Sequence, residues 1–113
     1  MEISVPPRIA GVYLLNVRVS VKAAPTFYVG ESVDIPYRLY THRCRWNSVR
    51  MVLLSPDKNR DRRRECERRF QAAALSMGLP LQNGKNHLPR AYPHEKETAV
   101  LQKALEFFQA EPK

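Results

Sequence analysis

The chain has 113 residues, with 19 Lys and Arg against 11 Asp and Glu, and a formal net charge of +8. This length suits one compact domain whose core needs no disulfide or metal to hold it together. The charge excludes an acidic, tail-like protein and favours a polyanionic partner, nucleic acid first and an anionic membrane surface second. No apolar run approaches the ~20 residues of a membrane-spanning helix, and the first residues lack the pattern of a secretory signal. We therefore expect a cytoplasmic protein that does not bind membranes.

The cysteines and two of the histidines offer little chemistry. Cys44 and Cys66 are too few and too far apart for a zinc site or a disulfide framework. We interpret them as reduced thiols, with Cys66 on the buried side of a helix. His87 and His94 lie beside prolines in a polar stretch, without cysteine partners at ligand spacing, and are expected at the surface.

Three segments predict β-strands. Residues 8–20 are dense in apolar and β-branched side chains, which is typical of a strand buried on at least one face. Residues 26–30 resume the pattern after Pro25, and a hairpin is the simplest connection between the two. Residues 49–54 form the third strand.

Three further segments predict helices. The first is capped by Ser32 or Asp34 and runs to about residue 43. The second occupies residues 57–77 and is closed by Gly78. The third spans residues 95–109, after a polar linker. The order strand, strand, helix, strand, helix, helix predicts an α/β (α+β) fold around a small antiparallel sheet.

The last predicted helix leaves one alternative open. Its apolar stripe includes Leu101, Leu105 and Phe108, which either cover the sheet or face a second subunit. Packing within the chain is the default.

Two near-matching phrases carry the most distinctive residues. Gly11-Val12-Tyr13 and Tyr28-Val29-Gly30 each present a tyrosine in a strand, and Arg38 and His42 follow. The last two lie four residues apart and so project from one face of the first helix. Two phenols, a guanidinium and an imidazole are the groups needed to hold a phosphodiester and move protons around it.

This series resembles the GIY-YIG nuclease family. A further block, residues 64–83, is similar to the part of that family in which a glutamate on an amphipathic helix precedes an asparagine. The resemblance covers roughly residues 9–83. It implies a three-stranded antiparallel sheet flanked by helices, with the nuclease core in residues 1–83. Residues 84–113 would then be a linker and a C-terminal helix packed on the core.

The resemblance also implies an activity, namely endonucleolytic hydrolysis of DNA phosphodiester bonds with one divalent metal, usually Mg²⁺ or else Mn²⁺. The roles implied by position are site phenols for Tyr13 and Tyr28, phosphate binding for Arg38, proton transfer for His42, metal binding for Glu67 and closure of the site for Asn83.

The chemistry of the side chains agrees with these roles. Arg38 can hydrogen-bond two phosphate oxygens at once, and Mg²⁺ takes only one or two protein carboxylates. Glu65 is the alternative metal ligand, but Phe70 and Ala74 place Glu67 nearer the buried face.

The general base stays open. A free tyrosine titrates near ~10, so a phenol acting as base needs a neighbouring cation or metal. Tyr13, His42 and a metal-bound hydroxide are the alternatives.

A run of arginines has two interpretations, a solvated helix face or a nucleic-acid surface, and we favour the second. The candidate nucleic-acid contacts are Arg43, Arg45, Arg60, Arg62, Arg63, Arg64 and Arg68. Trp46 is expected to be partly buried, although it could stack on a base.

Several functional alternatives remain at this point. The short chain favours recognition of a DNA structure, or targeting by a partner protein or second subunit. A non-catalytic nucleic-acid-binding module with the same fold is the alternative to an enzyme. RNA is not distinguished from DNA.

Overall fold

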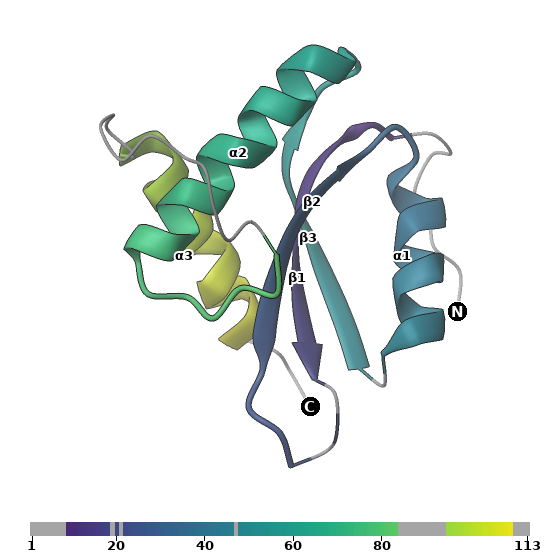
Figure 1. Cartoon of the computed structure of the whole chain (residues 1–113), viewed down its shortest axis with the longest axis vertical. Helices are drawn as coiled ribbons and strands as arrows, with labels where there is room; N and C mark the ends of the chain where they lie inside the picture. Colours follow the sequence, from purple (N-terminus) through teal and green to yellow (C-terminus); the bar gives the residue numbers. More distant parts are fainter. Residues whose placement is uncertain (1–8, 19, 21, 47, 84–94, 110–113) are drawn as a thin grey trace.

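A three-stranded antiparallel sheet with helices on both faces forms the fold (Figure 1). The computed structural model describes residues 9–18, 20, 22–46, 48–83 and 95–109. The elements in chain order are β1 (Gly11–Arg18), β2 (Thr26–Ser32), α1 (Ile35–Arg45), β3 (Ser48–Pro56), α2 (Arg60–Ser76) and α3 (Glu95–Gln109). The fold class predicted from the sequence is confirmed. Within the described part of the chain, no helix is long and apolar enough to span a membrane.

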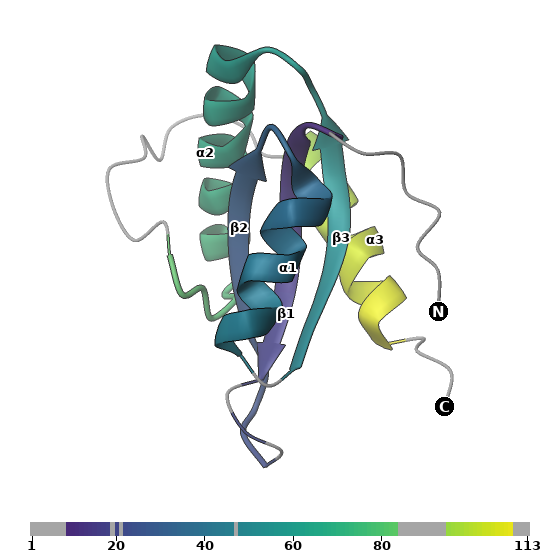
Figure 2. The same cartoon turned by 90° about the vertical axis from the view of Figure 1, so that its right-hand side faces the viewer.

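The central strand β1 explains the arrangement of the layers. It pairs antiparallel with β2 on one side and β3 on the other. Helix α1 covers one face of the sheet, while α2 and α3 cover the opposite face (Figures 1 and 2). Successive strand side chains point to opposite faces, so β1 is buried along nearly its whole length. Its continuous apolar sequence follows from this double coverage.

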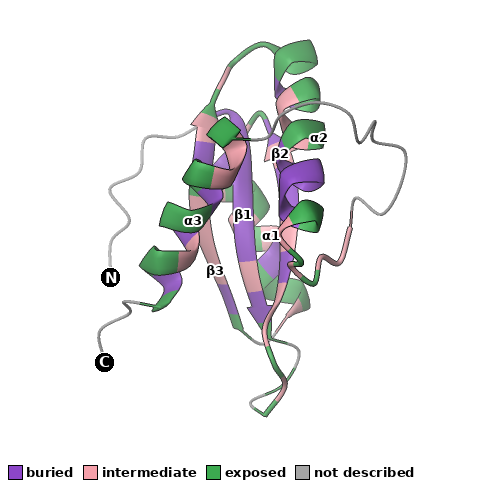
Figure 3. Ribbon diagram, turned by 90° about the vertical axis from the view of Figure 1, so that its left-hand side faces the viewer, coloured by how far each residue is buried: buried purple, intermediate pink, exposed green. Residues whose placement is uncertain are grey.

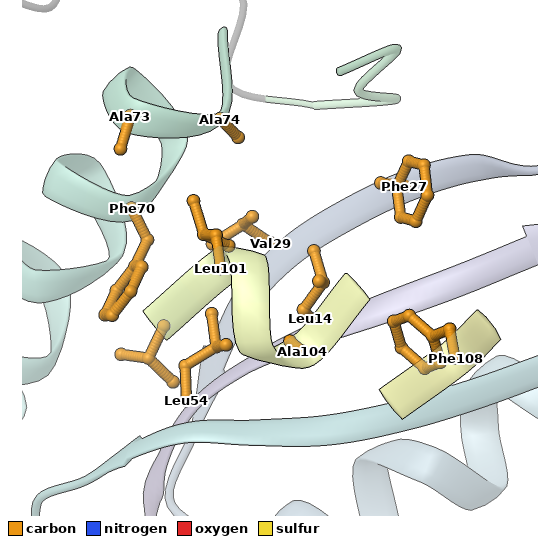
Figure 4. Packing of buried hydrophobic residues seen from close by; sticks show 11 residues of the cluster. Leu14, Phe27, Val29, Leu54, Phe70, Ala73, Ala74, Leu101, Ala104 and Phe108 are labelled. Carbon is orange, nitrogen blue, oxygen red and sulfur yellow. The ribbon is translucent and has the colours of Figure 1, made fainter. Parts of the chain in front are cut away.

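The larger core lies between the sheet and the pair α2 and α3. In this cluster Phe70 and Ala73 of α2 lie on the side of Leu101, whereas Phe108 at the other end of α3 lies near Phe27 of β2, with ring centroids 6.4 Å apart (Figure 4). Both helices present buried residues to the sheet and exposed residues to solvent (Figure 3). Helix α3 thus packs against its own chain.

The start of α1 resolves one alternative left open by the sequence. The Asp34 carboxylate accepts a hydrogen bond from the Tyr37 backbone N–H at 3.1 Å and caps the helix. The Ser32 hydroxyl instead accepts from the Asp34 N–H at 2.9 Å. A tight link therefore joins the end of β2 to α1.

Helix α2 begins later than predicted. Its N-cap is Asn59, whose side chain accepts from the Arg62 N–H at 2.9 Å. The prediction of a start at Asp57 was wrong, because that carboxylate accepts from the Asn59 N–H and pairs with the Arg62 guanidinium. At the other end, Gly78 has φ 80° and closes the helix as predicted.

Candidate active site

Tyr13 and His42 form the centre of the candidate site. Tyr13 is fully buried on the α1 face of β1, and its hydroxyl lies 2.9 Å from His42 Nε2. Burial, and next the neighbouring Tyr28, raise the pKa of Tyr13 above its ordinary range. Burial lowers the pKa of His42, and the positive charges of Arg38 and Arg45 lower it further. Both groups are therefore neutral near pH 7. The phenol donates to Nε2 when the imidazole proton is on Nδ1, and Nε2–H donates to the phenol oxygen in the other tautomer.

Aromatic packing holds the imidazole in place. The His42 ring stacks on Trp46, with centroids 5.2 Å apart and planes at 13°. Tyr28 lies edge-on to the same ring at 5.0 Å and stacks near Tyr13 at 6.3 Å. The Arg45 guanidinium lies 5.1 Å from the Trp46 centroid. Trp46 is half-buried, as the sequence predicted, and it supports His42.

The glycine of the second phrase makes room for the phenol. A Cβ atom at Gly30 would lie 2.5 Å from Tyr13 Oη and 2.8 Å from Tyr28 Cε1. Real Cβ atoms do not approach heavy atoms this closely. The glycine is therefore needed for space, which gives the Tyr-Val-Gly phrase a physical reason.

Glu67 reaches the same region from the opposite layer. Its half-buried carboxylate lies on α2, where burial and then the Glu31 carboxylate raise its pKa. Arg38 of α1 opposes that shift, and both Arg38 and Glu67 also act on the pKa of Tyr13. The guanidinium, the carboxylate and the phenol therefore lie within electrostatic range of one another. Helices α1 and α2 lie on opposite faces of the sheet (Figure 1).

The alternative glutamate lies elsewhere. Glu65 is exposed and pairs with Arg69, one helical turn further on, at 3.3 Å. Its position gives it no part in the group formed by Tyr13, Arg38 and Glu67. The placement therefore favours Glu67 as the site carboxylate.

Asn83 forms hydrogen bonds with the edge strand β2. Its amide oxygen accepts from the Val29 N–H at 3.2 Å, and its NH₂ donates to the Val29 carbonyl at 2.7 Å. The preceding segment pairs with Phe27, which bonds the Pro80 carbonyl and the Gln82 N–H. Asn83 therefore secures the strand that carries Tyr28, with its amide directed at the backbone of β2.

Arg63 is buried and does not lie on the surface that the sequence predicted for the arginines. It is 5% exposed, and its Nε donates to the Glu31 carboxylate at 2.7 Å. Its Nη1 donates to the Lys58 carbonyl at 3.0 Å. The expectation that Arg63 contacts nucleic acid is wrong for the folded chain, because the guanidinium faces inward. The signal was present in the sequence, since Arg63 shares the helical face of Glu67 and Phe70.

The other six predicted arginines are exposed: Arg43, Arg45, Arg60, Arg62, Arg64 and Arg68. Arg62 pairs with Asp57 at 3.0 Å. Arg64 lies 3.9 Å from the Glu31 carboxylate. Glu31 itself was missed by the sequence reasoning, although it directly follows the glycine at the end of the second phrase.

The residues present fit a hard divalent cation that keeps most of its waters. In the described ranges, no group of three or more His, Cys, Asp or Glu gathers to enclose a metal. Glu67 is half-buried, and the adjacent Glu31 adds negative charge. One or two carboxylates suffice for Mg²⁺. Of the cysteines, Cys44 is exposed and Cys66 half-buried. His87 and His94 lie outside the described residues.

Comparison of the chain with protein-family models, with curated proteins and with solved structures finds no match. The geometry of these residues and the order of the motifs in the sequence are therefore the observations that bear on function.

Proposed function

We propose that the chain is a metal-dependent endonuclease of the GIY-YIG type that hydrolyses DNA phosphodiester bonds. The observation that carries this proposal is the 2.9 Å hydrogen bond between Tyr13 and His42, formed beside Arg38 and Glu67. A buried phenol–imidazole pair next to a cation and a carboxylate is suited to phosphodiester chemistry.

Arg38 is the proposed phosphate ligand. Its side chain is exposed on the flank of α1, close enough to act on the pKa values of Tyr13, His42 and Glu67. Phosphodiester hydrolysis passes through a state with extra negative charge, and a fixed guanidinium stabilises that state. Mg²⁺ held by Glu67 would add positive charge on the side of α2.

The proton path runs through Tyr13 to His42. The raised pKa of Tyr13 keeps it protonated, so it cannot act alone as a base. A water attacking the phosphorus forms a P–O bond while the P–O bond to the leaving oxygen breaks. The proton of the water passes to the Tyr13 oxygen as the phenolic proton passes to Nε2 of His42 in its Nδ1–H tautomer, and the leaving oxygen takes a proton from solvent. Neutral His42 is then the final acceptor, and its lowered pKa keeps it neutral near pH 7. Tyr28 packs against both rings and keeps them aligned.

A panel of labelled nucleic acids with Mg²⁺ tests the proposal. Plain duplex, nicked, flapped, branched and single-stranded DNA, with an RNA counterpart, would reveal the substrate. Glu67→Ala should abolish cleavage, as should EDTA, whereas Glu65→Ala is the matched control and should cut normally. Arg38→Ala should also lose cleavage while keeping its fold.

The alternative, a non-catalytic nucleic-acid-binding module, predicts a different result. Such a protein would bind DNA in a salt-sensitive way with or without Mg²⁺ and leave every substrate uncut. That outcome would also follow if a targeting partner or second subunit is required, and adding such a partner would then restore cleavage.

A further inference from the structure

The outward side of α1 carries an exposed pair of tyrosines. Tyr37 is 61% and Tyr40 is 64% exposed, and their ring centroids lie 6.3 Å apart at 35°. Residues three apart share one side of a helix, and the exposure of both rings shows that this side of α1 is turned to solvent. Neither ring belongs to the hydrophobic clusters formed by the described residues. The pair therefore contributes little to the core.

The charged side chains of α1 itself are all positive. α1 contains Arg38, Arg43 and Arg45 and has no acidic residue between its first and last positions. Asp34 lies just before the helix, and its carboxylate accepts the capping hydrogen bond from the Tyr37 N–H. Exposed aromatic rings within a basic surface are the combination used to hold unpaired nucleic acid, because rings stack on bases while cations contact phosphates. An acidic or purely apolar partner would match only half of this surface.

We propose that the surface formed by Tyr37 and Tyr40 binds unpaired bases of the nucleic-acid strand whose phosphate is held at Arg38. The inference rests on the proposed function in taking Arg38 as the phosphate ligand. Arg38 directly follows Tyr37, and a helix with its side chains is only about 10–12 Å across. A strand held at the guanidinium therefore has bases within reach of both rings.

This surface narrows the class of substrate. In a duplex the bases are paired and stacked on one another, so they offer no free face to an external ring. A flap, loop or single-stranded end presents such faces. The proposed enzyme would therefore act beside an unpaired segment of DNA.

Fluorescence anisotropy in EDTA tests the inference without cleavage. A labelled mixed-sequence single strand and the matching duplex are titrated with the wild-type chain and with Tyr37→Ala/Tyr40→Ala. We expect the alanine variant to bind the single strand about tenfold or more weakly, from the usual strength of base–aromatic stacking. Its duplex affinity should be unchanged. Tyr37→Phe/Tyr40→Phe keeps both rings and should bind the single strand as wild type does.

Phe107→Ala is the matched control, because Phe107 is 60% exposed on α3, on the other face of the sheet. If Tyr37→Ala/Tyr40→Ala bound the single strand as wild type does, the inference would be overturned. A loss of single-strand affinity of the same size in Phe107→Ala would overturn it too. Failure of the wild type to bind single strands would overturn it as well.

The same measurements separate this inference from the proposed function. Cleavage of plain duplex by wild type and the alanine variant alike, with equal single-strand affinities, would reject the tyrosine surface and keep the nuclease. A tenfold loss of single-strand binding in a chain that cuts no substrate would support the surface and count against the nuclease.

Discussion

Replacing Arg63 by methionine should destabilise the fold without directly affecting the exposed arginine surface. The guanidinium bonds the Glu31 carboxylate at 2.7 Å and the backbone carbonyls of Lys58 and Asp57 at 3.0 and 3.4 Å. These contacts link the end of β2 to the turn before α2. Methionine keeps much of the side-chain length and loses every one of these bonds.

The magnitude follows from the burial of the pair. Breaking a buried ion pair costs about 3–5 kcal/mol, because the remaining charge is left without its partner. Here the Glu31 side chain is 19% exposed, and Arg64 lies 3.9 Å from its other oxygen. Water and Arg64 partly compensate, so we expect a loss of about 2–3 kcal/mol in the free energy of unfolding. For a domain of this size that corresponds to a fall in Tm of about 10 °C.

Urea unfolding of Arg63→Met, Glu31→Gln, their double variant and Arg62→Met measures this effect. Arg62→Met is the matched control, since Arg62 precedes Arg63, is 72% exposed in its side chain and should leave stability nearly unchanged. Glu31→Gln/Arg63→Met should be less destabilised than the sum of its single mutants, by about 1 kcal/mol or more. If Arg63→Met were as stable as Arg62→Met and instead lost DNA affinity, Arg63 would be a surface ligand and our reasoning would be refuted.

Three further predictions concern the phenol–imidazole pair. Gly30→Ala should cost about 1–3 kcal/mol and most of the cleavage activity, because the new Cβ displaces the Tyr13 ring. Gly11→Ala is the comparison, because its Cβ would lie 2.5 Å from the Ser55 carbonyl oxygen. It should lower stability and leave the activity per folded molecule unchanged, and activity losses of equal size in Gly11→Ala and Gly30→Ala would contradict this. Tyr13→Phe keeps the ring and should reduce kcat by about 10²–10⁴-fold in single-turnover assays, and an unchanged kcat would remove the hydroxyl from the proton path. The lowered pKa of His42 means that the unfolded chain binds more protons below pH ~6.5, so stability is complete above that value and falls on acidification. Urea unfolding at several pH values gives the free energy of unfolding as a function of pH. This free energy should fall less steeply on acidification for His42→Gln than for wild type, and an identical fall would exclude His42 as the cause.

Much of the fold could be predicted because its determinants are local. Strand β1 is apolar from Val12 to Leu15, α3 has a regular apolar stripe, and Gly78 closes α2 with a left-handed residue. Each of these signals acts within a few residues, so the sequence displays it directly. The start of α2 was missed for a related reason. Asp57 and Asn59 are both good caps, and the side-chain contacts of Asp57 decide between them.

The arginines of α2 illustrate what local reasoning misses. In the sequence Arg63 looks like Arg62 and Arg64, and its charge suggests a solvated side chain. The packing of α2 against the end of β2 buries Arg63 and gives it Glu31 as partner. A carboxylate thirty-two positions earlier in the chain therefore determines what this arginine does.

The sequence by itself determined the order of the elements, the residues of the candidate site and the positive charge that favours a nucleic-acid partner. Only the tertiary structure decided which of these residues meet. It pairs Tyr13 with His42, sets Arg38 and Glu67 within electrostatic range of each other, and turns Asn83 toward the backbone of β2. The physical reason is the separation along the chain over which each effect acts. Periodicity and capping are properties of neighbouring residues, whereas burial, charge pairing and pKa depend on chain segments that come together only when the two helical layers pack on the sheet.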